Sequence, residues 1–223
     1  MKAIYLIRHT TPAVDKGICY GQTDLDVTES FSEEAEMILR SLPADIAAVY
    51  SSPLQRCTRL ASHLFPNMPL LLRPELMELH CGSWEMRGWD SLPKDEIGPW
   101  MEDFVNVRVP GGESYIDLYD RVMGCWAQIA GGVYGAAGGS DGSGRQNGSA
   151  GGSIAVVAHG GVIRSILAGI TGTPLVDSFK AFSLHYGCVV RVRPGEGLYE
   201  VLWNMPQPEK EQHKPSSFYK KFT

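Results

Sequence analysis

The chain has 223 residues, enough to bury one substantial core, and its 43% hydrophobic and 20% charged content is that of an ordinary globular protein. A net charge of −5 argues against a nucleic-acid-binding surface, and no apolar run is long enough to span a membrane. The five cysteines are scattered without a Cys-x-x-Cys spacing, which argues against a disulfide framework or a zinc site. With reduced thiols and an opening apolar segment too short for a signal peptide, we expect a cytoplasmic protein.

The first apolar segment, from Ala3 to Ile7, is short and partly β-branched, and it predicts a buried strand. Arg8 and His9 follow at once, where such a strand leaves the core. Because ligands bind at the carboxyl ends of strands in open α/β sheets, this pair suggests a nucleophile or base beside an anion clamp. A surface arginine beside a buried structural histidine is the simpler explanation for such a pair alone.

The next predicted elements are a loop, a helix and a second strand. The loop contains the compact run from Tyr20 to Asp24, and the helix spans Ser32 to Leu42, with Ser32 as its cap and Pro43 closing it. The strand spans Ile46 to Tyr50.

The run Ser51-Ser52-Pro53 then predicts a helix start, with a serine as N-cap and Pro53 in the first helical position. Arg56 would lie about one turn inside this helix, where free N–H groups already favour an anion. A solvated arginine on the helix surface is the alternative.

A third short strand, Leu70 to Leu72, leads into a dense loop from Pro74 to Met86. This loop combines carboxylates with aromatic and apolar neighbours. A carboxylic acid kept partly dry can donate a proton near neutral pH. The candidates are Glu75, Glu78 and Glu85, and these residues alone do not rank them.

The second half of the chain predicts a helix at Tyr115 to Ile129, introduced by Gly111-Gly112-Glu113-Ser114. Residues 131–153 are rich in glycine and serine and predict a surface loop rather than a phosphate-binding loop, because no Gly-Lys-Ser/Thr ending is present. The segments 188–193 and 198–203 predict a β-hairpin, and a loosely attached tail follows from residue 205.

The clearest buried strand is Ile154 to Ala158, and it ends in His159-Gly160-Gly161 before another predicted helix. Glycines at this point let backbone N–H groups approach a ligand closely. A second histidine is therefore expected at the carboxyl end of a strand.

Two histidines and two arginines thus follow predicted strand ends. This combination of side chains is suited to phosphoryl transfer. A neutral imidazole can attack phosphorus, guanidinium groups suit the phosphoryl oxygens, and the second histidine can donate to the same oxygens. A nearby glutamate can protonate the leaving alkoxide and then activate water. This scheme requires no metal ion or other cofactor, and the sequence contains no Mg²⁺ or nucleotide motif.

Five motifs of this chain resemble, in the same order, those of the histidine phosphatase (phosphoglycerate mutase-like) superfamily. They are Leu6-Ile7-Arg8-His9-Thr10, Ser51-Ser52-Pro53-Leu54-Gln55-Arg56, Glu78-Leu79-His80-Cys81-Gly82-Ser83-Trp84-Glu85, Gly111-Gly112-Glu113-Ser114 and Val157-Ala158-His159-Gly160-Gly161. Within the superfamily the chain is most similar to the α-ribazole phosphatase branch. The resemblance implies a three-layer α/β/α sandwich with a mostly parallel central sheet. Residues 1–204 would form a single catalytic domain, followed by a tail at 205–223.

The resemblance also implies a role for each motif residue. His9 would be the phosphorylated nucleophile, and Glu78 matches the usual proton donor. The rest of the phosphate pocket would be formed by Arg8, Arg56 and His159, with substrate or phosphate contacts from Gln22, Thr23 and the backbone of Gly160. The chain departs from the family pattern at Thr10, where a glycine is usual, and at Asp15, where an asparagine is frequent.

The expected activity is metal-independent hydrolysis of a small phosphomonoester, with α-ribazole 5′-phosphate of cobalamin biosynthesis as the favoured substrate. The alternatives are a sugar-phosphate phosphatase or a phosphoglycerate mutase of the same superfamily, a phospho-ligand-binding protein without turnover, and a metallohydrolase using His9, His80 and His159. Nucleic acid and membrane partners are not expected. The oligomeric state stays open, with a homodimer as one candidate.

Overall fold

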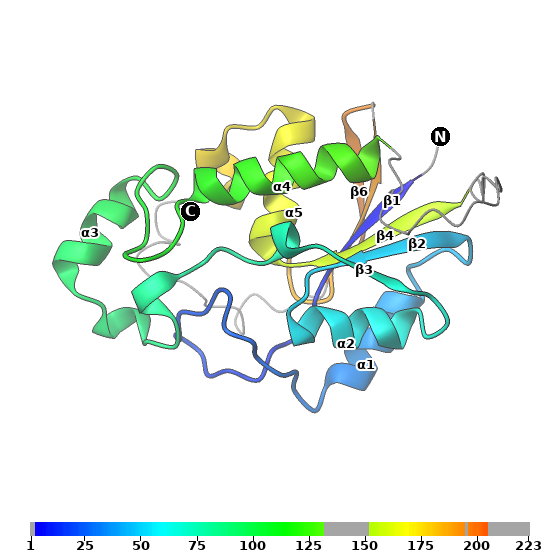
Figure 1. Ribbon diagram of the computed structural model, residues 1–223, viewed down its shortest axis with the longest axis horizontal. Helices are drawn as coiled ribbons and strands as arrows, with labels where there is room; N and C mark the ends of the chain where they lie inside the picture. Colours follow the sequence, from blue (N-terminus) through cyan, green and yellow to red (C-terminus); the bar gives the residue numbers. More distant parts are fainter. Residues whose placement is uncertain (1–2, 132–151, 195, 205–223) are drawn as a thin grey trace, which may run out of the picture.

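The computed structural model describes residues 3–131, 152–194 and 196–204. They contain a six-stranded sheet in the order β3-β2-β4-β1-β5-β6 (Figure 1). The strands are β1 (Ile4–Arg8), β2 (Ile46–Ser51), β3 (Leu70–Leu72), β4 (Ser153–Ala158), β5 (Val189–Arg193) and β6 (Leu198–Trp203). The first four run parallel and the last two form an antiparallel hairpin, so the predicted mostly parallel sheet is confirmed. The predicted Gly/Ser-rich loop (except its end residues) and the tail lie outside the described residues.

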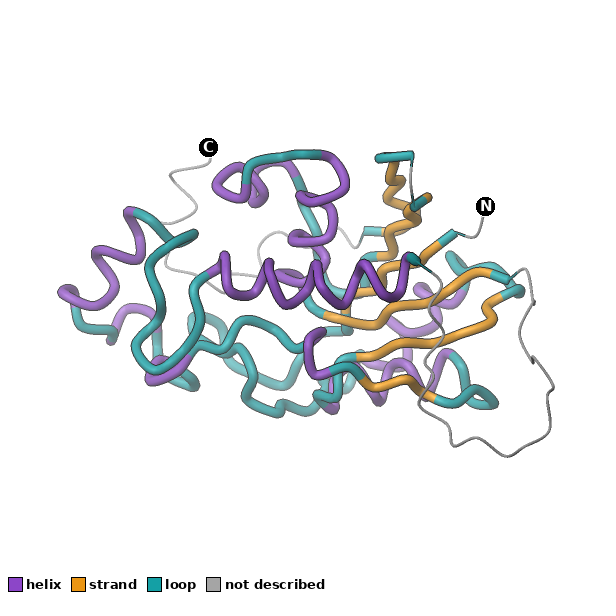
Figure 2. Tube along the Cα trace, turned by 45° about the horizontal axis from the view of Figure 1, so that its top comes forward, coloured by secondary structure: helices purple, strands orange, loops and turns teal. Residues whose placement is uncertain are grey.

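Helices cover both faces of this sheet (Figures 1 and 2). One face packs against α1 (Phe31–Leu39) and α2 (Gln55–Leu64), and the other against α4 (Tyr115–Ala130) and α5 (Gly160–Thr171). Successive residues of a strand point to opposite faces. Accordingly, Tyr5 and Ile7 join the core under α1 and α2, while Ile4 and Leu6 join the core under α4 and α5. The predicted three-layer sandwich is therefore confirmed.

The connection between β3 and α4 is built around aromatic packing. It contains α3 (Lys94–Glu102) and three 3-10 turns, at Pro74–Leu76, Gly82–Trp84 and Trp89–Ser91. The ring of Trp100 lies 5.7 Å from that of Trp84 and 5.9 Å from that of Trp89, all three side chains being buried. This cluster packs the turns at Gly82–Trp84 and Trp89–Ser91 against α3. A further 3-10 turn (Leu175–Asp177) and α6 (Ser178–Ala181) follow α5.

Two predicted helix starts are wrong. The first helix begins at Phe31 with Ser30 as N-cap, so Ser32 lies inside it, and it ends at Leu39. The second begins at Gln55, so Pro53 precedes it. The backbone of Leu54 is extended (ψ 136°), and the Ser52 hydroxyl lies 2.8 Å from Nε2 of His159. The Ser52 hydroxyl accepts a hydrogen bond from the Leu54 N–H (3.4 Å), which lies ahead of α2, and is bound to a histidine at the neighbouring strand end.

The start of α4 is capped by side chains. The Ser114 hydroxyl accepts a hydrogen bond from the Asp117 N–H (3.4 Å), and the Asp117 carboxylate accepts one from the Ser114 N–H (2.8 Å). This reciprocal pair satisfies donors that a helix terminus leaves without partners.

We expect Ser114→Ala to lower the free energy of unfolding by about 1 kcal/mol, because the helix loses its side-chain cap. Urea denaturation measures the change. Gln128→Ala, at an exposed position of the same helix, is the control and should change the stability by less than about 0.5 kcal/mol. Equal stability of Ser114→Ala and the control would contradict the capping role.

Candidate active site

Strand register brings the two predicted histidines together. In the parallel pair β1–β4, Arg8 is opposite Ala158, so the next residue of each strand leaves the sheet at the same edge. The His9 N–H donates to the Ala158 carbonyl at 3.0 Å, and the ring centroids of His9 and His159 are 5.1 Å apart. Both side chains lie at the carboxyl ends of parallel strands, where α/β sheets bind ligands.

The environment of His9 fixes its tautomer. Its Nδ1 lies 2.7 Å from the carbonyl oxygen of Thr10. A carbonyl can only accept a hydrogen bond, so Nδ1 carries the proton and the lone pair of the neutral ring is on Nε2. The ring is 2% exposed and lies 5.5 Å from the ring of Tyr186.

His159 is fully buried, and its Nε2 lies 2.8 Å from the hydroxyl of Ser52 and 3.5 Å from Sγ of Cys57. Burial lowers its pKa well below 6.5, and the positive charges of Arg56 and Arg8 lower it further. His159 is therefore neutral at pH 7 in the free protein.

This buried histidine predicts a pH dependence of stability. Its pKa is lower in the folded than in the unfolded chain, so the unfolded chain binds more protons as the pH falls below 6.5. We expect the free energy of unfolding to fall with acidification in that range, by at most about 1.4 kcal/mol per pH unit from this group. Urea denaturation between pH 5 and 8 tests this. His159→Gln should show a shallower pH slope, and identical slopes would contradict the assignment.

The two arginines approach the histidines from different elements. Arg8 donates from Nη1 to the Leu184 carbonyl at 2.5 Å, and its guanidinium lies 4.2 Å from the ring centroid of Tyr186. Arg56 is fully buried in the first turn of α2 and donates to the carbonyls of Thr23 (2.8 Å) and Gly21 (2.6 Å).

Arg56 forms no ion pair with a carboxylate of the described residues. Its recorded hydrogen-bond partners are neutral carbonyls, and its buried Nε has no hydrogen-bond partner among the described residues. A buried guanidinium without a carboxylate partner favours an anion beside it.

Glu78 reaches the same region from the loop between β3 and α4. Its carboxylate accepts hydrogen bonds from the N–H of Gly161 (3.0 Å) and from the N–H of Leu79 (2.9 Å). A Cβ at position 161 would lie 2.2 Å from Oε1 of Glu78, so only glycine lets the carboxylate approach the start of α5. Glu75, in contrast, is exposed.

The carboxylate of Glu85 holds the loop at residues 21–23 in place. Its carboxylate accepts hydrogen bonds from five donors: the N–H groups of Gly21, Gln22, Thr23 and Cys81, and the hydroxyl of Thr23. Burial alone would raise its pKa, but these hydrogen bonds outweigh burial and lower it. A low pKa with five donors is unsuited to proton donation, so the geometry favours Glu78 over Glu85.

Gln22 and Thr23 lie in this loop. Gln22 donates from Nε2 to the Glu78 carbonyl at 3.0 Å. The hydroxyl of Thr23 is used by Glu85, while its carbonyl is bound by Arg56. The structure therefore places both residues between Glu78 and Arg56, with the Thr23 side chain directed to Glu85.

Gly160 is the first residue of α5, and a Cβ there would lie 3.3 Å from Cζ of Arg8. The departures from the family pattern are accommodated without backbone strain. Met86 has the one positive φ among the described residues other than glycine, so Thr10 has a negative φ. Asp15 is exposed to solvent.

Two neighbours of the histidines, Ser52 and Tyr186, are absent from the predicted site. The Ser-Ser-Pro run that contains Ser52 is also a helix-start pattern. The run therefore predicts a helix cap, and the sequence does not indicate the contact of Ser52 with His159. The ring of Tyr186 lies tilted against that of His9 and contacts Arg8, and its hydroxyl hydrogen-bonds to the hydroxyl of Tyr20 (2.7 Å). Burial raises the pKa of Tyr20 to about 12, so this hydroxyl stays protonated.

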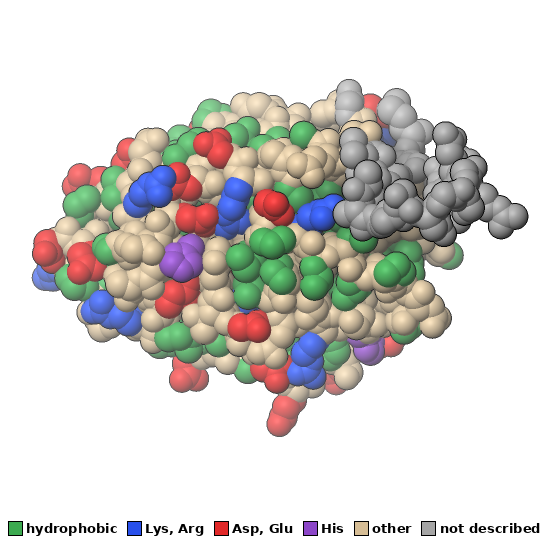
Figure 3. Space-filling model, in the orientation of Figure 1, with side chains coloured by type: hydrophobic (Ala, Val, Ile, Leu, Met, Phe, Trp, Pro, Cys, Tyr) green, Lys and Arg blue, Asp and Glu red, His purple; other side chains and the backbone are tan. Residues whose placement is uncertain are grey.

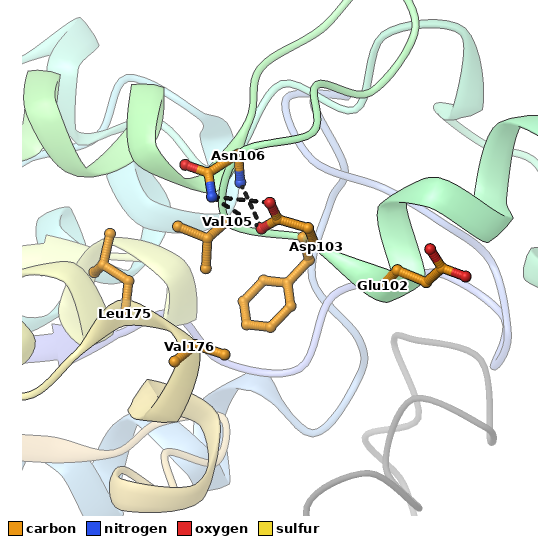
Figure 4. Close-up of a pocket in the computed structure, with 7 residues that line it drawn as sticks. Glu102, Asp103, Val105, Asn106, Leu175 and Val176 are labelled. Carbon is orange, nitrogen blue, oxygen red and sulfur yellow. Dashed lines mark hydrogen bonds between the residues drawn. The ribbon is translucent and has the colours of Figure 1, made fainter.

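A separate hollow of about 280 Å³ lies where the end of α3 meets the turn at Leu175–Asp177 (Figure 4). Leu175 and Val176 line one side, and the carboxylate of Asp103 is bound by the side-chain amide of Asn106. It contains none of the predicted site residues.

Acidic and basic side chains are interspersed on the face in Figure 3. Within residues 3–131, 152–194 and 196–204, no helix has the length and hydrophobicity to cross a bilayer, and no three His, Cys, Asp or Glu side chains are grouped to hold a metal ion.

The comparison that decides the family covers most of the chain. The family profile of the histidine phosphatase superfamily (branch 1) matches residues 4–205. The chain belongs to this superfamily. It is therefore a phosphatase/mutase-type enzyme of that superfamily, and its substrate is a phosphorylated small molecule.

This histidine phosphatase superfamily chain is similar to several known proteins. The α-ribazole phosphatase of Shigella flexneri shares its fold, with a TM-score of 0.74 and 22% identity, covering 89% of this chain and 94% of that one. "Putative phosphoserine phosphatase 2" of Hydrogenobacter thermophilus is 28% identical over 182 residues, 78% of this chain and 81% of the relative. "Probable phosphoglycerate mutase GpmB" of Escherichia fergusonii is 33% identical over 131 residues, which span 55% of this chain and 60% of the relative.

Proposed function

We propose that this chain hydrolyses a phosphomonoester through a phosphohistidine on His9, without a metal ion. The observation that carries the proposal is the tautomer of His9, whose Nδ1–H is held by the Thr10 carbonyl so that the lone pair is on Nε2. A neutral imidazole with a lone pair on Nε2 is a competent nucleophile towards phosphorus. The buried charge of Arg56 and the neighbouring Arg8 supply the attraction for the phosphoryl group.

The reaction has two displacements at phosphorus. In the first, Nε2 of His9 forms a bond to phosphorus while the bond to the leaving oxygen breaks, and Glu78 transfers its proton to that oxygen. In the second, Glu78 takes a proton from water, the water oxygen bonds to phosphorus, and the bond to Nε2 breaks. His159, neutral before binding, donates a hydrogen bond to a phosphoryl oxygen.

We propose α-ribazole 5′-phosphate as the substrate. The five motifs support the superfamily, and the support for this substrate is that, within the superfamily, the chain is most similar to the α-ribazole phosphatase branch. Phosphoserine is the second candidate, because a relative over 78% of the chain has a phosphoserine phosphatase name. The mutase alternative differs chemically, since a mutase returns the phosphoryl group to an acceptor instead of transferring it to water.

The test is a panel of phosphomonoesters assayed for phosphate release: α-ribazole 5′-phosphate, L-phosphoserine, a sugar phosphate and 3-phosphoglycerate. We expect the highest kcat/KM with α-ribazole 5′-phosphate. If this ester is hydrolysed no faster than the others, the substrate proposal fails. Formation of 2-phosphoglycerate with 2,3-bisphosphoglycerate as primer, in place of phosphate release, would indicate a mutase. Phosphate binding without turnover of any ester would indicate a binding protein.

The same panel with EDTA tests the metal-free scheme. We expect activity to be unchanged after incubation with EDTA, because nucleophile, acid and anion clamp are all side chains of the chain. Loss of activity with EDTA and recovery on adding a divalent cation would overturn the metal-free scheme and favour a metallohydrolase.

A further inference from the structure

Arg121 of α4 binds the backbone of the segment that contains Glu78. Its guanidinium donates to the carbonyls of Glu75 (2.7 Å), Met77 (2.8 Å) and Glu78 (2.9 Å). It also forms a two-pronged ion pair with the Glu113 carboxylate, at 2.8 Å from both Nε and Nη2. These five hydrogen bonds use the full donor set of a guanidinium group, so Arg121 has no donor left for a phosphate.

Glu113 completes the clamp from the other side. Its carboxylate accepts a hydrogen bond from the His80 N–H at 3.0 Å, and its own N–H donates to the His80 carbonyl at 2.9 Å. Burial opposes ionisation of Glu113, but the hydrogen bonds from Arg121 and His80 outweigh it and lower the pKa. A Cβ at Gly112 would lie 2.2 Å from the His80 carbonyl, so this close approach requires a glycine.

The backbone carbonyl and the side-chain carboxylate of Glu78 are thus each bound by a different helix. Arg121 of α4 binds its carbonyl together with Nε2 of Gln22, while the Gly161 N–H at the start of α5 binds its carboxylate together with the adjacent Leu79 N–H. A shift of the backbone at residue 78 would move the carboxylate off this N–H. The geometry therefore makes the carboxylate position depend on the α4 clamp.

We infer that Arg121 is a positioning residue, which sets the Glu78 carboxylate at the place where it protonates the leaving oxygen. This inference rests on the proposed acid role of Glu78. It assigns a use to the Gly111-Gly112-Glu113-Ser114 motif, which contributes no group to the phosphate pocket: Glu113 orients Arg121, and Arg121 orients the acid.

The test uses the leaving group. An alkyl phosphate needs proton donation as its P–O bond breaks, whereas 2,4-dinitrophenyl phosphate releases a stable anion and does not. We expect Arg121→Met to lower kcat for the alkyl ester by about 100-fold, the lower range for lost general acid catalysis, and to leave kcat for the dinitrophenyl ester nearly unchanged. Arg121→Lys should partly restore kcat for the alkyl ester. Arg108→Met, which removes an exposed ion pair with Asp117 near the same helix end, is the control and should behave as wild type.

Glu78→Gln in the same assay separates the two proposals. We expect it to lose kcat selectively for the alkyl ester, and the Arg121→Met effect to disappear in the Glu78→Gln background. Selective loss in Glu78→Gln with a uniform loss in Arg121→Met would overturn the positioning role while the acid role stands. Equal loss on both esters in Glu78→Gln would overturn the acid role and the inference together. Should Arg121→Met not fold, Glu113→Gln is the replacement, with the same selective loss expected.

Discussion

Replacing His9 with alanine is expected to lower kcat/KM for phosphomonoester hydrolysis by about 10⁴-fold or more, the scale of loss when a covalent nucleophile is removed. The reason is structural as well as chemical. Of the two histidines, His9 has its Nδ1 bound to a carbonyl oxygen, which leaves its Nε2 lone pair available. Nε2 of His159 lies against the Ser52 hydroxyl. His159 therefore cannot substitute as nucleophile without breaking this contact.

The measurement is steady-state hydrolysis of p-nitrophenyl phosphate and of α-ribazole 5′-phosphate, with circular dichroism to verify the fold. His63→Ala is the matched control, because His63 is exposed near the end of α2 and lies against Phe31. The control should retain wild-type kcat/KM. Retained activity in His9→Ala would remove the nucleophile assignment.

Replacing Arg56 with lysine is expected to lower kcat/KM by about 10²- to 10³-fold, comparable to the loss of one transition-state hydrogen-bond donor. The guanidinium binds the carbonyls of Gly21 and Thr23 with its two terminal nitrogens, and its buried Nε has no hydrogen-bond partner in the described part of the chain. An ammonium group has the charge but not the planar fork, so it cannot hold this loop and clamp a phosphoryl group together.

Inhibition by inorganic phosphate distinguishes this cause from general misfolding. We expect the inhibition constant for phosphate to rise in Arg56→Lys along with the loss of kcat/KM. Arg59→Met, one turn on in α2, is the control, because Arg59 is half-exposed and pairs with Asp26 at the surface. Unchanged phosphate inhibition in Arg56→Lys would contradict a phosphate-binding role for Arg56.

The strands could be predicted from the sequence because their apolar, β-branched runs are short and bounded by turns. Their neighbours in the sheet could not, because β1 and β4 are separated by more than half of the chain, and their pairing depends on tertiary packing. Only that pairing places His9 beside His159. The helix start at Pro53 failed for a related reason. The local pattern favours a cap at Ser52, but the Ser52 hydroxyl is bound to the distant His159, and the N–H that it accepts is that of Leu54, which precedes α2.

The glutamates illustrate the same limit within the site. Glu75, Glu78 and Glu85 share one loop and one residue type, so local sequence does not separate them. Their roles differ by long-range contacts: Glu85 binds a loop more than 60 positions earlier, and Glu78 binds the start of α5. Arg121 gave no local signal at all, since the carbonyls that it binds lie more than 40 positions before it.

The central claim is that the phosphoryl group passes through His9, and trapping it tests this claim most directly. A rapid-quench experiment with a substrate labelled in its phosphoryl group, followed by mass spectrometry of peptides from the quenched protein, locates the covalent intermediate. We expect label that is stable in base and labile in acid, on the peptide that contains His9, and none in His9→Ala. Turnover of the labelled ester without any label on His9, or label on another residue, would contradict the account.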